Sequence, residues 1–220
     1  MALLPGRRSM RTAARYNDTH GDQDTRDTDR MRLFAAVLPP EDVVREFAGV
    51  VARLKNVPGA DGLRWTERAG WHFTLAFYGE VDDELLPELT ARLARAASRT
   101  EPFALALRGG GQFGRGRALW AGAEGDLRTM RLLAGRSEAA ARKAGVAMDE
   151  HRRYKAHLTV ARSRDGVDAR PYLKVLEDFR SRTWTVDELV LVRSTLPTSG
   201  TPGEQPRYEA VARRPLGAAG

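Results

Sequence analysis

Two short stretches of the chain carry the same arrangement of chemically useful side chains. Residues 71–77 read Trp-His-Phe-Thr-Leu-Ala-Phe and residues 156–162 read Ala-His-Leu-Thr-Val-Ala-Arg. In a β-strand, side chains two residues apart point to the same face and lie roughly 6.6 Å apart. Each stretch therefore predicts an imidazole beside a hydroxyl on one open face, His72 with Thr74 and His157 with Thr159. The apolar residues between and after them, including Phe73, Leu75 and Phe77, are expected to face the core.

This pair of motifs suits displacement at phosphorus. The reaction needs a base on the attacking nucleophile and an acid on the leaving oxygen, on opposite sides of the phosphorus atom. Two histidines can supply both groups near neutral pH, and threonine hydroxyls can donate hydrogen bonds to the non-bridging oxygens. A single His-x-Thr arises often in ordinary strands, whereas two copies in matched contexts favour a catalytic function.

The sequence around the motifs mixes strand-like and helix-like segments. We expect strands at 32–38, 63–66, 71–78, 103–107, 118–121, 157–161 and 189–193, and helices at 41–55, about 82–97, about 126–144 and 171–179. The elements do not alternate strictly, which favours an α+β fold with sheets covered on one face over a doubly wound parallel sheet. The glycine-rich stretch 109–116 lies between two strands and predicts a hairpin or a site loop, not a nucleotide-binding turn.

The composition limits the class of protein. A chain of 220 residues, 42% of them hydrophobic and 30% charged, is typical of a globular domain that buries a core. It contains no cysteine, which excludes thiol catalysis and cysteine-ligated metals, and the paired carboxylates lack the spacing of a metal site. No run is long enough to span a membrane and no secretory signal is recognisable, so we expect a cytoplasmic protein.

The charge and its distribution point to a polyanionic partner. The net charge is +7, and 32 of the 36 basic residues are arginine, whose planar guanidinium matches phosphate groups. Residues 1–30 are polar throughout and lack apolar periodicity, so we expect a disordered tail, with Met31 as an alternative start. The basic balance persists without this tail and therefore belongs to the folded part.

On these residues the chain resembles the two-histidine (2H) phosphoesterases, and within them the bacterial and archaeal RNA 2',3'-cyclic phosphodiesterases, also called 2'-5' RNA ligases. The resemblance covers about residues 31–216 and rests on the Arg-Leu-Phe strand followed by proline, on Arg64-Trp65, on 72–81 and on 157–162; Ser194 and Tyr208 also match. It implies one two-lobed α+β domain with pseudo-two-fold, duplicated antiparallel sheets, helices on the outer faces and a central cleft. It also implies no metal and no cofactor, and residues 217–220 are expected to be a short flexible end.

The resemblance also implies roles for individual residues. His72 is the proton donor to the leaving 3'-oxygen and His157 is the proton acceptor from water, which leaves a 2'-phosphate on the RNA. Arg162 matches a phosphate-binding arginine of the family, although strict alternation along a strand places it on the face opposite His157. A bulge that turns it inward and a surface ion pair both remain open. Trp65 and Tyr154 are candidates to stack on an RNA base or to belong to the core.

The leading hypothesis is a monomeric hydrolase that acts on RNA 2',3'-cyclic phosphate ends. Joining ends through a 2'-5' linkage is the reverse chemistry, and we expect it only as a side activity because water is abundant in an open site. A 2H enzyme acting on a small cyclic nucleotide phosphate is a further alternative. A non-catalytic RNA-end-binding module is the remaining one, and the intact histidines and threonines of both motifs count against it.

Overall fold

The computed structural model describes residues 30–148, 153–199, 201 and 203–217. The expected N-terminal tail, apart from Arg30, and the last three residues of the expected flexible end lie outside the described residues. Arg30 was expected in the tail, but it is the first residue of a strand, and its guanidinium lies 2.6 Å from the carboxylate of Asp82. The first strand therefore includes the last residue of the predicted tail.

Strands and helices occur in the predicted mixed order. The strands are β1 (Arg30–Val37), β2 (Arg64–Trp65), β3 (Phe73–Asp82), β4 (Phe103–Phe113), β5 (Ala118–Gly125), β6 (Leu158–Arg162), β7 (Trp184–Val186), β8 (Glu188–Thr195) and β9 (Arg207–Pro215). The helices are α1 (Glu41–Lys55), α2 (Leu86–Ser98), α3 (Leu127–Lys143) and α4 (Arg170–Glu177), and none of those described combines the length and apolar character needed to cross a bilayer.

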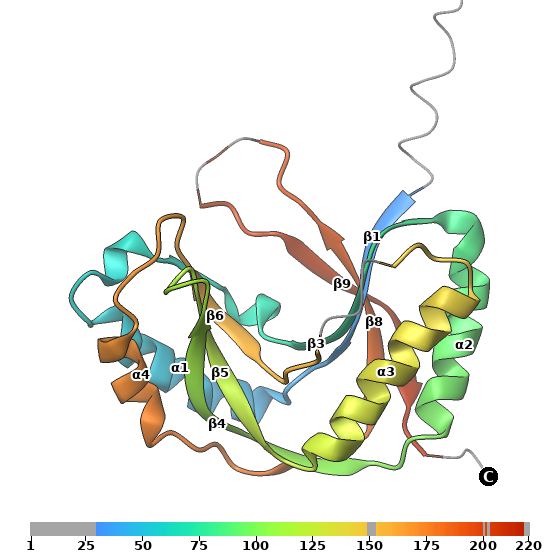
Figure 1. Ribbon diagram of the computed structural model, residues 1–220, viewed down its shortest axis with the longest axis horizontal. Helices are drawn as coiled ribbons and strands as arrows, with labels where there is room; N and C mark the ends of the chain where they lie inside the picture. The colour runs from blue at the N-terminus through green and yellow to red at the C-terminus, as the bar shows by residue number, and fades with distance from the viewer. Residues whose placement is uncertain (1–29, 149–152, 200, 202, 218–220) are drawn as a thin grey trace, which may run out of the picture.

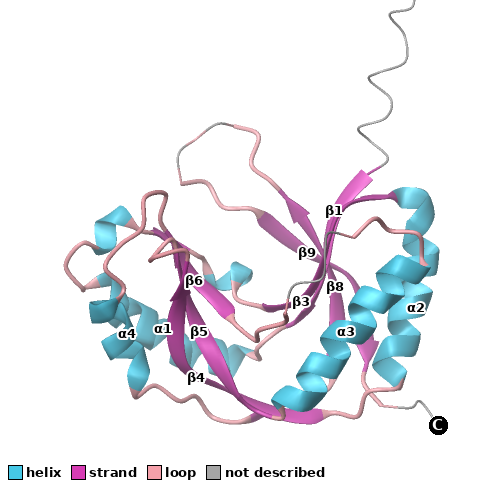
Figure 2. Ribbon diagram, in the orientation of Figure 1, coloured by secondary structure: helices cyan, strands magenta, loops and turns pink. Residues whose placement is uncertain are grey.

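One antiparallel sheet connects all the strands in the order β7-β4-β5-β6-β3-β1-β8-β9, with β2 paired to β6. Its two halves meet at the neighbours β6 and β3, which share the single residue pair Phe73 and Leu158. Each half thus has a His-x-Thr strand on its inner side, and the strand order reads symmetrically outward from that junction. Figures 1 and 2 show the halves as two walls, with α1 and α4 beside β4–β6 and with α2 and α3 beside β3 and β8. The expected α+β fold with two pseudo-symmetric lobes is confirmed.

Each half of the sheet is covered by a helix that follows a strand of the other half. Helix α1 follows β1 but packs beside α4, where the ring of Phe47 lies 5.6 Å from that of Phe179. Helix α3 follows β5 but packs against α2 and β3, where the Tyr78 hydroxyl donates a hydrogen bond of 3.3 Å to the carbonyl of Ser137. Helices α1 and α3 thus each connect the two half-sheets, and their buried faces stabilise the arrangement of the halves.

We expect the α1 contact to be a main source of stability. Phe47 is fully buried and its ring packs against Trp71 as well as Phe179, so Phe47→Ala should lower the free energy of unfolding by about 3–5 kcal/mol. Leu132→Ala on the exposed side of α3 is the control and should change it by less than about 0.5 kcal/mol. Urea unfolding measures both, and equal losses would contradict this account of the core.

Candidate active site

The junction of the two half-sheets decides which way the two motifs face. Phe73 and Leu158 are directly paired and fully buried, so their side chains point into the core. The residues on either side of each must then point to the opposite face, because side chains alternate along a strand. Both histidines and both threonines of the motifs flank this pair.

The same register sets the arrangement of the four polar side chains. Counting one residue outward from the junction, His72 stands across from Thr159, and Thr74 stands across from His157. The two histidines are diagonal neighbours, for which a Cβ separation of roughly 7–8 Å is typical. This spacing leaves room for a phosphate between the imidazoles, with one hydroxyl beside each.

His72 lies in an apolar environment. Its ring centroid is 4.6 Å from that of Phe34 and 5.3 Å from that of Tyr208. Burial, together with the positive charge that His157 can carry, lowers the pKa of His72 to about 4. His72 is therefore neutral near pH 7 when no anion is bound.

The His157 ring is held by the backbone just before β6. Its Nδ1 lies 2.8 Å from the carbonyl oxygen of Lys155, and because a carbonyl only accepts, Nδ1 carries the proton and Nε2 has a free lone pair. The ring also packs edge-on against Phe113, with centroids 5.0 Å apart, and lies 6.3 Å from Trp120. Burial lowers the pKa of His157, the Lys155 carbonyl opposes that shift, and the positive charges of Arg162 and Lys155 reinforce it.

A pocket of about 320 Å³ opens beside His72 and Thr74. Three guanidinium groups line it, those of Arg32, Arg64 and Arg162, and the same three arginines counteract the burial that raises the pKa of Tyr208. The arginines come from β1, β2 and β6, so both half-sheets contribute positive charge. Such a pocket is suited to an anion.

Arg162 faces this pocket because β6 contains a bulge. Leu119 of β5 pairs with Ala161 and the next residue pairs with Thr159, so Val160 is an extra residue on the β6 side. The extra residue turns Arg162 to the face of Thr159, as one of the two sequence interpretations required. Arg162 also stands directly opposite Arg64, a juxtaposition of like charges that is unfavourable unless an anion lies between them.

A matching bulge explains why one core prediction is wrong. Phe77 was expected to be buried, but it is 43% exposed and lines the pocket, with the guanidinium of Arg32 4.6 Å from its ring centroid. Thr74 and Ala76 pair with consecutive residues of β1, so Leu75 is an extra residue on the β3 side. Strict alternation fails at the same position in both motifs.

The two aromatic candidates are placed elsewhere. The Trp65 indole N–H donates to the carbonyl of Ala60 at 3.0 Å, and its ring packs near Tyr172, outside the pocket that contains His72. Tyr154 lines a different pocket, on the His157 side. Arg32, Phe34 and Lys155 were not predicted to belong to the site. Alternation along the first strand places Arg32 and Phe34 on one face and could have identified them, whereas no sequence pattern marks the Lys155 carbonyl.

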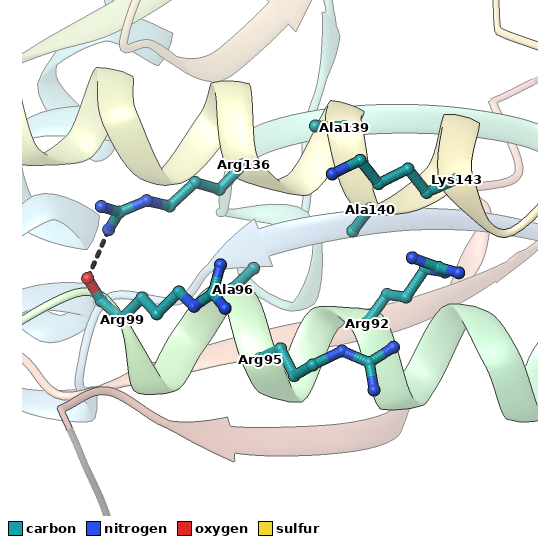
Figure 3. Close-up of a pocket in the computed structure, with 8 residues that line it drawn as sticks. All are labelled: Arg92, Arg95, Ala96, Arg99, Arg136, Ala139, Ala140 and Lys143. Carbon is teal, nitrogen blue, oxygen red and sulfur yellow. Dashed lines mark hydrogen bonds between the residues drawn. The ribbon is translucent and has the colours of Figure 1, made fainter.

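A second cluster of basic side chains lies away from the histidines, in a groove between α2 and α3. Figure 3 shows Arg136 of α3 with its guanidinium directed at the backbone carbonyl of Arg99, the residue that follows α2, to which it donates at 2.6 Å. The groove has basic and alanine side chains but no histidine or carboxylate among its described lining residues. Its described lining thus differs from the surroundings of His72 and His157, where imidazoles and hydroxyls lie together.

Comparisons with known proteins agree with this geometry. A family model described as LigT like Phosphoesterase matches residues 37–120. The RNA 2',3'-cyclic phosphodiesterase of Thermus thermophilus is 34% identical over 176 residues, which span 77% of this chain and 85% of the relative. That of Archaeoglobus fulgidus is 35% identical over 135 residues, or 60% of this chain and 72% of the relative. The crystal structure of E. coli LigT in apo form superposes with a TM-score of 0.68 at 26% identity, covering 86% of this chain and 99% of that one.

Paired imidazoles on a curled antiparallel sheet define a phosphoesterase of the two-histidine class. The chain belongs to the LigT-like phosphoesterase family.

The burial of His72 predicts a specific pH dependence of stability. Its pKa is about 4 in the folded protein and near 6.5 when unfolded, so between these values the unfolded state binds more protons. The free energy of unfolding should therefore be fully retained above about pH 6.5 and should fall toward pH 4, by at most about 3 kcal/mol from this group. His72→Gln should lack this loss of stability at low pH. Urea unfolding of the wild-type protein and the variant at about pH 7 and about pH 4.5 measures the free energies of unfolding. An equal change between the two pH values in both proteins would show that His72 titrates normally.

Proposed function

We propose that the protein hydrolyses the 2',3'-cyclic phosphate ends of RNA to 2'-phosphomonoesters by acid–base catalysis with His72 and His157. The observation that carries the proposal is the register at Phe73 and Leu158, which supports an imidazole and a hydroxyl from each motif on the same face of the sheet, next to one another. The RNA 2',3'-cyclic phosphodiesterase relatives support this choice of substrate. All the residues involved come from one chain, so we infer that a monomer is sufficient.

The phosphate is held by side chains that this chain provides. Arg64 and Arg162 face each other and attract the anion, and a bound phosphate relieves their mutual repulsion. Thr74 and Thr159 donate hydrogen bonds to non-bridging oxygens as negative charge develops on them. The phosphate also lies close to His72, and its negative charge raises the pKa of that imidazole from the low value of the free protein.

The reaction then proceeds as an in-line displacement. His157 accepts a proton from water at Nε2, the water oxygen bonds to phosphorus, and the bond from phosphorus to the 3'-oxygen breaks. His72 donates its proton to that 3'-oxygen, which becomes a hydroxyl while the phosphate remains on the 2'-oxygen. The Lys155 carbonyl stabilises the protonated His157 through Nδ1–H. Ligation through a 2'-5' linkage would use the same groups in reverse and is expected only as a side activity.

The direct test is incubation with an oligoribonucleotide that ends in a 2',3'-cyclic phosphate, in the presence of EDTA. We expect turnover in EDTA because no proposed step requires a metal, and a 2'-phosphate product because the bond to the 3'-oxygen breaks. His72→Ala and His157→Ala should each lower kcat by about 10²- to 10⁴-fold, and the double variant should be little slower than either single one. A 3'-phosphate product, or full activity in both single variants, would refute the proposal.

A substrate with a better leaving group distinguishes the acid from the base. In a 3'-deoxynucleoside 2'-(4-nitrophenyl phosphate), nitrophenolate departs without needing a proton. We therefore expect His72→Ala to recover most of its lost kcat on this substrate, while His157→Ala stays slow because water still requires a base. Recovery in His157→Ala alone would invert the two roles, and absorbance of released nitrophenolate provides the measurement.

A further inference from the structure

A second pocket, of about 670 Å³, lies next to His157, because two of the residues that line it contact that histidine. Strands β4 and β5, the start of α3 and residues 153–156 surround it. Trp120 and Lys155 line this pocket, and both also contact His157, the first through its ring and the second through its backbone carbonyl. The pocket that contains His72 lies on the other side of the catalytic pair. The described residues therefore form one pocket where the phosphate is proposed to bind and a second pocket beyond His157.

The second pocket carries excess positive charge. Four basic side chains line it, and its described lining residues include no carboxylate: Arg108, Arg131, Arg153 and Lys155. The Arg108 guanidinium lies 3.9 Å from Glu124, which partly neutralises it. Among the described residues, Arg131 and Arg153 have no carboxylate within ion-pair distance, and both are exposed. Their charges are free to attract an anion.

Two buried donors in the lining residues also lack acceptors. The indole N–H of Trp120 and the hydroxyl of Tyr154 are inaccessible to solvent and have no hydrogen-bond partner among the described residues. Trp120 as a whole is only 8% exposed. Native proteins leave few buried donors unsatisfied, and each one in a pocket wall indicates a place where a ligand can supply the acceptor.

The glycine-rich stretch noted in the sequence shapes this pocket. Gly111 pairs directly with Trp120, and a Cβ at Gly111 would lie 2.1 Å from Cζ2 of the indole. A Cβ at Gly110 would lie 2.7 Å from the Trp120 carbonyl oxygen. Glycine at these positions lets the indole lie flat on β4, where the Lys155 ammonium sits 4.1 Å from the ring centroid. The stretch is therefore required for the aromatic wall beside His157.

We propose that this pocket binds the RNA chain immediately upstream of the terminal cyclic phosphate, with an upstream phosphodiester facing Arg131 and Arg153. The proposal rests on the proposed function and adds a length requirement to it. Phosphodiester oxygens accept hydrogen bonds from guanidinium, hydroxyl and indole donors, which are the groups this pocket offers. A mononucleoside cyclic phosphate fills only the catalytic site, so the enzyme selects RNA chain ends over free cyclic nucleotides.

The test compares kcat/KM for adenosine 2',3'-cyclic phosphate and for a short oligoribonucleotide with the same terminal group. The wild-type protein should prefer the oligonucleotide by about 10- to 100-fold. Tyr154→Phe and Arg131→Gln should each lower kcat/KM for the oligonucleotide by about 3- to 10-fold and change the mononucleotide value by less than about two-fold. Arg131→Gln should also reduce the slope of log kcat/KM against log salt by about 0.7 for the oligonucleotide.

Arg99→Gln is the matched control, since it removes one exposed positive charge from the groove between α2 and α3 in Figure 3. It should leave both substrates unchanged. A loss for the oligonucleotide in Arg99→Gln but not in Arg131→Gln would place the RNA over that outer groove and overturn the proposal. Equal wild-type activity on both substrates would also overturn it.

A binding measurement separates this proposal from the proposed activity. Fluorescence anisotropy with a labelled oligoribonucleotide ending in a 2'-phosphate should show weaker binding by Tyr154→Phe and Arg131→Gln, whether or not the protein turns over substrate. If the wild-type protein hydrolyses neither cyclic phosphate, the proposed function fails, and these affinities still test the pocket. Unchanged affinities in both variants would refute the pocket as an RNA site.

Discussion

The active site depends on a single backbone junction, the antiparallel pairing of Phe73 with Leu158. Within each half-sheet, neighbouring strands such as β1 and β3, or β5 and β6, share several residue pairs. Between β3 and β6, Phe73 and Leu158 are the only described pair. A shift of one residue in either strand would turn its histidine and threonine from the pocket into the core. Both side chains of the pair are fully buried, so the apolar core on one face fixes the position of the catalytic groups on the other.

One pair of residues can hold this register because the helices lock the halves together from outside. Helix α1 crosses from β1 to the half formed by β4, β5 and β6, and α3 crosses in the opposite direction to pack on β3. Separating the halves would expose the buried faces of both helices, including Phe47 on α1 and Met130 on α3. Strands β3 and β6 can therefore separate on either side of the Phe73–Leu158 pair, which makes room for pockets while the register at that pair is kept.

The sequence predicted what simple periodicity controls. Helix 41–55 is correct at both ends because its apolar spacing is regular and proline and glycine bound it, and the face of the His-x-Thr pairs follows from alternation. Alternation fails at Phe77 and Arg162, which lie three residues after the threonines, because each follows a bulge at Leu75 or Val160. A bulge depends on the neighbouring strand and cannot be read from one motif. Strand β9 was missed because it is a half-exposed edge strand with weak alternation and charged residues.

The two motifs are nearly equivalent, so the difference between acid and base must come from residues outside them. His157 is held at Nδ1 by the Lys155 carbonyl, which leaves Nε2 as an acceptor and favours the imidazolium that the proposed mechanism requires. His72 is packed between Phe34 and Tyr208, an environment that disfavours its charged form until a phosphate arrives. A proton placed on such a group by a bound anion is readily given up when the leaving oxygen acquires charge. The duplicated sheet thus supplies two identical groups, and in the proposed mechanism their unequal surroundings favour His72 as the donor and His157 as the acceptor.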